Sequence, residues 1–162
     1  MTVRRFLIVG VVILAGFLFF YVGNPFTHPL GTPKKSVNHC LQWFEEGKWN
    51  RLYGALHPDL KKRVIPRLRS NLQTLLKEYE SSVQADSIDE LNDKQVFRTY
   101  MQSISQSAAF KQQRIAYHQA TVNSVSREDN KATVKLTSPR RLRISVLTLK
   151  QRNNRWLVRN YR

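Results

Sequence analysis

The stretch Lys131-Ala-Thr-Val-Lys-Leu136 decides the fold, because its apolar and polar side chains alternate at a strict period of two. Such a period is typical of a strand with one buried and one exposed face. The preceding Arg-Glu-Asp-Asn at 127–130 is a hairpin turn signal. The stretch therefore predicts a half-buried strand entered from a hairpin.

The strand pattern continues on both sides of this stretch. We expect a looser strand over 115–125, a third strand over 141–146, and a fourth over 155–159 after a turn at Asn153-Asn154. Four strands joined by short turns predict an antiparallel meander.

Apolar residues before position 110 recur at helical spacing instead. Four helices are predicted: from a Ser36 cap to Gly47, from Trp49 to Leu56, from Asp59 or Pro66 to Glu80, and from a Ser87–Glu90 capping box to Ile104. Helices segregated from strands predict an α+β fold, with the helices packed on a curved antiparallel sheet of about four strands.

The N-terminal region holds an uncharged apolar run, Phe6–Gly23. At about 1.5 Å per residue it would form a helix of roughly 27 Å, close to the ~30 Å hydrocarbon core of a bilayer. We expect an uncleaved transmembrane helix that contacts membrane lipid. A cleaved signal peptide would have a shorter apolar core and a small-x-small site, and a lipobox would need Cys where Phe17 stands.

Flanking charge predicts the orientation of this helix. Arg4 and Arg5 lie before the run, whereas the nearest cations after it are Lys34 and Lys35. The positive-inside rule keeps 1–5 as a cytoplasmic tail. The organisation is then a tail, an anchor over 6–23, a Pro-rich spacer over 24–35, and one domain over 36–162 on the exoplasmic side, in a bacterial periplasm or at the cell exterior.

Charge is the strongest functional signal in this domain. The net charge is +16, and every charged residue from Lys131 to Arg162 is basic. Six of these basic residues alternate with apolar neighbours along the predicted strands. They predict a basic plate on one sheet face, formed by Lys131, Lys135, Arg141, Arg143, Arg155 and Arg159. The plate is either a solvated surface or a binding face for an anionic partner.

The sequence leaves four classes of anionic partner open: phospholipid headgroups, a wall polymer, an acidic protein and nucleic acid. The predicted anchor favours the first three. Exposed aromatic side chains for stacking on bases are sparse among the basic positions, which argues against nucleic acid.

Candidates for chemistry are few. His57 and Asp59 flank Pro58 and could form an acid–base pair, or a turn in which Asp59 caps the next helix. His118, on the predicted strand, could point inward or be an ordinary core histidine. The sequence holds no metal-ligand spacing and no phosphate-binding glycine loop, so no metal and no cofactor are expected.

Two short patterns carry a family resemblance. Phe44–Tyr53, followed by Leu56-His57-Pro58-Asp59, and the closing Asn154-Arg155-Trp156-Leu157-Val158 resemble the nuclear transport factor 2-like superfamily, a cystatin-like cone, and its small membrane-anchored bacterial members. The resemblance implies a cone over about 36–162. Enzymes of this superfamily commonly use an Asp or a His–Asp pair deep in the cone, but 131–162 contains no acid.

Anchored domains of this fold act as assembly scaffolds in type IV secretion systems, and this chain is similar in plan. The resemblance and the basic plate together predict a non-enzymatic accessory or scaffold subunit. It would dock to a membrane protein complex or an anionic surface. The alternative is a small-molecule binding protein or enzyme that uses the cone interior.

Overall fold

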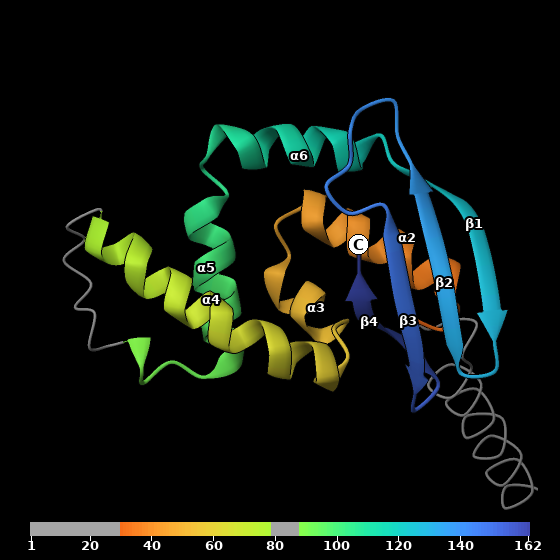
Figure 1. Ribbon diagram of the computed structural model, residues 1–162, viewed down its shortest axis with the longest axis horizontal. Coiled ribbons are helices and arrows are strands. Elements are labelled where there is room, and N and C mark those ends of the chain that lie inside the picture. The colour runs from red at the N-terminus through yellow and green to blue at the C-terminus, as the bar shows by residue number, and fades with distance from the viewer. Residues whose placement is uncertain (1–29, 79–87) are drawn as a thin grey trace, which may run out of the picture.

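The computed structural model describes residues 30–78 and 88–162. Over these residues the fold is α+β, with helices first and strands last, as predicted (Figure 1). The elements are α2 (Pro33–Glu45), α3 (Trp49–Gly54), α4 (Pro58–Glu78), α5 (Asp93–Ile104), α6 (Ala108–His118), β1 (Thr121–Glu128), β2 (Lys131–Thr137), β3 (Val146–Arg152) and β4 (Arg155–Tyr161).

The strands form one four-stranded antiparallel sheet in the order β1-β2-β3-β4, which confirms the predicted meander. The turn between β3 and β4 places Asn153 and Asn154 at φ +48° and +58°. Asn tolerates this left-handed region better than most residues, so the pair suits a tight hairpin. Asp129, in the β1–β2 turn, has φ +48° for the same reason.

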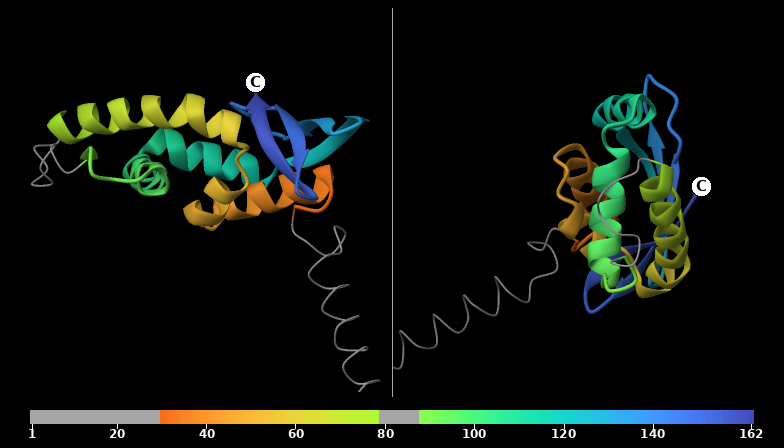
Figure 2. Two further views of the ribbon diagram at one scale, coloured as in Figure 1. Left: turned by 90° about the horizontal axis from the view of Figure 1, so that it is seen from below. Right: turned by 90° about the vertical axis from the view of Figure 1, so that its left-hand side faces the viewer.

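The inner face of the sheet forms the larger core. Val134 and Leu149 are fully buried and Trp156 is 1% exposed, while α2 contributes the fully buried Val37. α2 lies along this face, and α4 and α5 extend away from the sheet (Figure 2). A second core cluster joins the helices to one another through Trp49, Ile65, Val96, Phe97 and Phe110.

The last strand is paired on both sides. The Trp156 amide donates to the Leu30 carbonyl at 2.7 Å, and the Val158 amide donates to the Ala55 carbonyl at 2.9 Å. The His57 amide in turn donates to the Val158 carbonyl at 2.8 Å. These bonds place the entry to the domain and the start of α4 against β4, while β1 forms the opposite, mostly exposed edge.

Two predicted helix starts are wrong, whereas α4 begins at Pro58, next to the predicted Asp59. α2 begins at Pro33 with Thr32 as its cap, because the Thr32 hydroxyl accepts from the Lys35 amide and proline suits a first helical turn. Residues 33–35 of the predicted spacer are therefore helical. α4 runs unbroken from Pro58 through Pro66. The capping box of α5 is Asn92 with Gln95, and Ser87 lies outside the described residues.

Two predicted strands are also wrong. Residues 115–118 close α6, and the strand begins only at Thr121, because an exposed edge strand carries no apolar alternation. Residues 141–145 form a loop. The period-two pattern of apolar residues in this loop arises because Leu142 and Ile144 are half-buried and pack against the core. Neither residue belongs to a strand of the sheet.

No helix in 30–78 or 88–162 combines the length and the apolar character needed to cross a bilayer. The predicted cytoplasmic tail, the anchor Phe6–Gly23 and residues 24–29 of the spacer lie outside the described residues.

Candidate functional site

The outer face of the sheet collects exposed cations from three strands. Lys131 and Lys135 on β2 and Arg155 on β4 lie there, out of phase with buried neighbours, as predicted. Cross-strand pairing adds Lys150 opposite Lys131, and Arg152 opposite Arg155. We call the set Lys131, Lys135, Lys150, Arg152 and Arg155 the basic sheet face.

Sequence reasoning missed Lys150 and Arg152. Both alternate with the buried Leu147 and Leu149 on β3, so a period-two signal was present. The signal was overlooked because the third strand was placed over 141–146, which left 147–152 as an approach to the turn.

The basic sheet face has no acidic partner. Within the described part of the chain, none of its five side chains forms an ion pair. Glu128 lies opposite Lys131 on β1, but without an ion pair. Like charges opposite each other, such as Lys131 and Lys150, destabilise a sheet. Fold stability therefore does not account for this concentration of charge.

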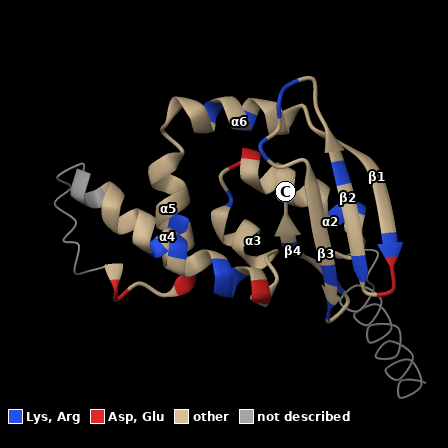
Figure 3. Ribbon diagram, in the orientation of Figure 1, with Lys and Arg blue, Asp and Glu red and all other residues tan. Residues whose placement is uncertain are grey.

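Arg141 and Arg143 do not belong to this face. Both lie in the loop after β2, and the Arg143 amide donates to Gln113 Oε1 on α6 at 3.1 Å. The loop leaves the sheet at the end of β2 remote from Lys131. Figure 3 accordingly shows Lys and Arg near both hairpin turns and, separately, on this loop.

Arg159, the sixth predicted member, is engaged by α4. A register shift in the β3–β4 ladder falls at this residue. Arg159 Nε lies 3.4 Å from Asp59 Oδ2, and its carbonyl accepts from Arg63 Nη2 at 2.7 Å. Arg159 therefore helps to hold the start of α4 against β4.

His57 and Asp59 do come together, but in a helix start. The buried His57 accepts the Asp59 amide through Nδ1 at 3.2 Å, and Asp59 Oδ2 lies 3.4 Å from the same nitrogen. His57, and not Asp59 as predicted, therefore supplies the capping side chain. Burial lowers the pKa of His57, and the charges of Lys150, Arg159 and Arg152 lower it further, against the opposing effect of Asp59.

His118 makes its contacts in a different part of the molecule from His57 and Asp59. It ends α6, and its Nδ1 is 2.6 Å from Glu45 Oε1 on α2, with both side chains largely exposed. The prediction that it lies on a strand is wrong. The three candidate catalytic residues therefore do not converge on one site.

An apolar cavity of about 270 Å³ lies between the helices and the inner sheet face. Its lining includes Leu41, Phe44, Leu52, Leu56, Val64, Leu68, Phe97, Met101, Leu136, Ile144, Leu147, Val158, Cys40, Tyr117 and Tyr161. The Tyr117 hydroxyl accepts from the Ile144 amide at 2.8 Å. Burial raises the pKa of Cys40 to about 12, so its thiol stays protonated. None of His57, Asp59 and His118 lines this cavity.

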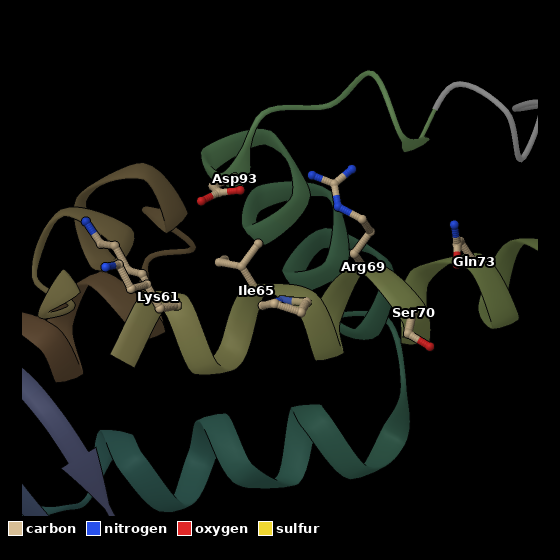
Figure 4. Close-up of a pocket in the computed structure, with 8 residues that line it drawn as sticks. Lys61, Ile65, Arg69, Ser70, Gln73 and Asp93 are labelled. Carbon is tan, nitrogen blue, oxygen red and sulfur yellow. The ribbon is translucent and has the colours of Figure 1, made fainter. Parts of the chain in front are cut away.

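A shallower groove of about 350 Å³ follows α4 (Figure 4). Two of its three basic side chains have structural partners. Arg69 donates to the carbonyls of Ile88 and Leu91, and Lys61 Nζ lies 4.0 Å from the centre of the Tyr53 ring. Burial lowers the pKa of Lys61, against the opposing charge of Asp93. Arg69 on α4 thus holds the described residues just before α5 in place.

No group of three or more His, Cys, Asp or Glu side chains suited to a metal ion occurs within 30–78 and 88–162. In the comparisons with known proteins, no family model matches the chain, and neither a curated protein nor a solved structure matches it.

Proposed function

We propose that this chain is a membrane-tethered, non-enzymatic accessory or scaffold subunit, related to the membrane-anchored cone-shaped domains, that docks through its basic sheet face. The observation that carries the proposal is that Lys131, Lys150, Arg152 and Arg155 gather on the outer sheet face and that none of them forms an ion pair within the described residues. Basic clusters of this kind mark surfaces for anionic partners.

The rest of the molecule supports the same function. The most reactive side-chain types are committed to packing or capping: Cys40 is buried and His57 caps α4. The apolar run Phe6–Gly23 supplies the proposed tether. A tether raises the local concentration of the domain at a membrane surface, so even weak charge contacts would suffice for docking.

Fractionation of the full-length chain tests the tether. We expect the protein to stay with membranes through alkaline carbonate and to keep its N-terminal residues. Recovery of a mature chain that begins near Asn24 would contradict the tether.

Docking is tested by affinity purification in mild detergent. Lys150→Glu/Arg152→Glu should reduce the recovery of co-purifying membrane proteins or anionic polymer. Lys94→Glu/Arg98→Glu, which makes the same charge change on exposed positions of α5, should not. Equal recovery from all three proteins would leave the basic sheet face as a solvated surface.

The second candidate function is the binding of an apolar small molecule in the cone interior. The cavity of about 270 Å³ favours it, because its lining is almost entirely apolar and large enough for part of a lipid-like ligand. Native mass spectrometry of the purified full-length protein tests this function. A bound apolar molecule that Leu68→Trp displaces would support it, and an empty protein would oppose it.

A further inference from the structure

Both hairpin turns of the sheet lie at one end of the molecule. The Gln151 amide donates to the Asn130 carbonyl at 2.8 Å, which ties the β3–β4 hairpin to the β1–β2 turn. We call this part the hairpin end. It carries five cations and two acidic residues: Arg127, Lys131, Lys150, Arg152, Arg155, Glu128 and Asp129.

The chain also enters the domain at the hairpin end. The Leu30 carbonyl accepts from the amide of Trp156, the residue after Arg155. Only residues 24–29 separate Leu30 from the end of the apolar run at Gly23. Seven steps of extended chain span about 25 Å at most. An anchor over 6–23 would therefore hold the hairpin end within that distance of the bilayer.

From these two observations we propose that the hairpin end docks on the anionic phospholipid headgroups of the bilayer that holds the chain's own apolar run. This inference rests on the tether in the proposed function and names the partner of the basic face. Charge complementarity and the short reach select headgroups over a soluble partner. Screening over about 8 Å at physiological ionic strength makes such docking salt-dependent.

Docking in this way fixes an orientation. The C-terminal ends of β2 and β4 lie about 20 Å from the hairpins, given ~3.3 Å per residue. Tyr161 and Ile144, which line the apolar cavity, are at that remote end. That part of the cavity lining would then lie on the side away from the bilayer.

Headgroup proximity tests the proposal in the full-length chain, reconstituted in nanodiscs of phosphatidylcholine with or without phosphatidylglycerol. A fluorophore is attached through Asn130→Cys at the hairpin end, and in a matched protein through Gln106→Cys in the α5–α6 turn at the far side of the molecule (Figure 1). Cys40 is buried and stays unlabelled. Quenching by a headgroup-attached quencher reports proximity.

The expected result is strong quenching at position 130 only in nanodiscs with phosphatidylglycerol, decreasing as salt rises. Lys150→Glu/Arg152→Glu should reduce the docking equilibrium constant about 25-fold or more, since each surface cation contributes roughly fivefold. Lys94→Glu/Arg98→Glu and the probe at position 106 should show no such change. Circular dichroism confirms that each variant is folded.

The other outcomes overturn the proposal in distinguishable ways. Equal quenching in both lipids, or an equal loss in both charge-reversal variants, contradicts headgroup docking. If partner recovery in detergent still depends on Lys150 and Arg152, the proposed function survives that result with an acidic protein or polymer as the partner. A chain that does not co-elute with nanodiscs contradicts the tether, and with it both proposals.

Discussion

The two faces of one sheet differ in what their side chains do. On the inner face, Val134, Leu149 and Trp156 are at most 1% exposed and share a core cluster with Val37 of α2. On the outer face, one to three residues away along the same strands, the exposed Lys131 and the half-buried Lys150 stand opposite each other. We therefore assign stability to the inner face and recognition to the outer face.

The largest expected effect belongs to the inner face. Trp156→Ala should lower the free energy of unfolding by about 3–5 kcal/mol, because it removes a large aromatic side chain from a packed core. Arg155→Ala, the adjacent outward-facing change, should alter it by less than about 0.5 kcal/mol. Urea denaturation measures both. Similar losses of unfolding free energy in the two variants would show that the inner face does not supply more stability than the outer face.

A pH effect is expected at His57, which caps α4 beside β4. Its pKa is lowered in the folded protein, so the unfolded chain takes up a proton first as pH falls. Its contribution to stability should be fully present above the ordinary histidine pKa of about 6.5 and be lost as pH falls through the lowered folded value.

His57→Asn isolates this contribution, because asparagine can cap α4 without titrating. Denaturation midpoints between neutral and mildly acidic pH should decrease less steeply for the variant than for the unmodified protein. Identical pH profiles would mean that His57 is not the group responsible.

The inner face could be predicted from sequence and parts of the outer face could not. Ala132, Val134 and Leu136 alternate with polar residues because one side of β2 is buried and the other faces solvent. β1 gave no such signal, since Val125 on this edge strand is 41% exposed. Leu142 and Ile144 gave a false strand signal, because loop residues that pack on a core show the same alternation of apolar and polar side chains as strand residues.

The candidate site was found in part for the same reason. Lys131, Lys135 and Arg155 follow from strand phase alone. Lys150 and Arg152 follow from strand phase only once the third strand is placed over Val146–Arg152, which depends on where the loop over 138–145 ends. The apolar cavity could not be predicted, because sequence shows which side chains are apolar but not how completely they fill the space between helices and sheet.

A smaller effect should appear on the outer face itself. Lys150→Glu replaces a like-charge pair with Lys131 by an opposite-charge pair, so it should raise the free energy of unfolding by about 0.2–1 kcal/mol at low salt. The same change removes a cation that lowers the pKa of His57, so that pKa should rise in an NMR titration. Lys94→Glu on α5 should leave the pKa of His57 unchanged. A loss of stability in Lys150→Glu would show that Lys150 has a structural partner.

The most direct test of the division between the faces measures stability and docking on the same preparations of Lys150→Glu/Arg152→Glu. We expect a free energy of unfolding within about 1 kcal/mol of that of the unmodified protein. We also expect the loss of salt-dependent headgroup quenching at position 130. A variant that docks as before, or one that loses docking only because it unfolds, would show that the outer face is not a separate docking surface.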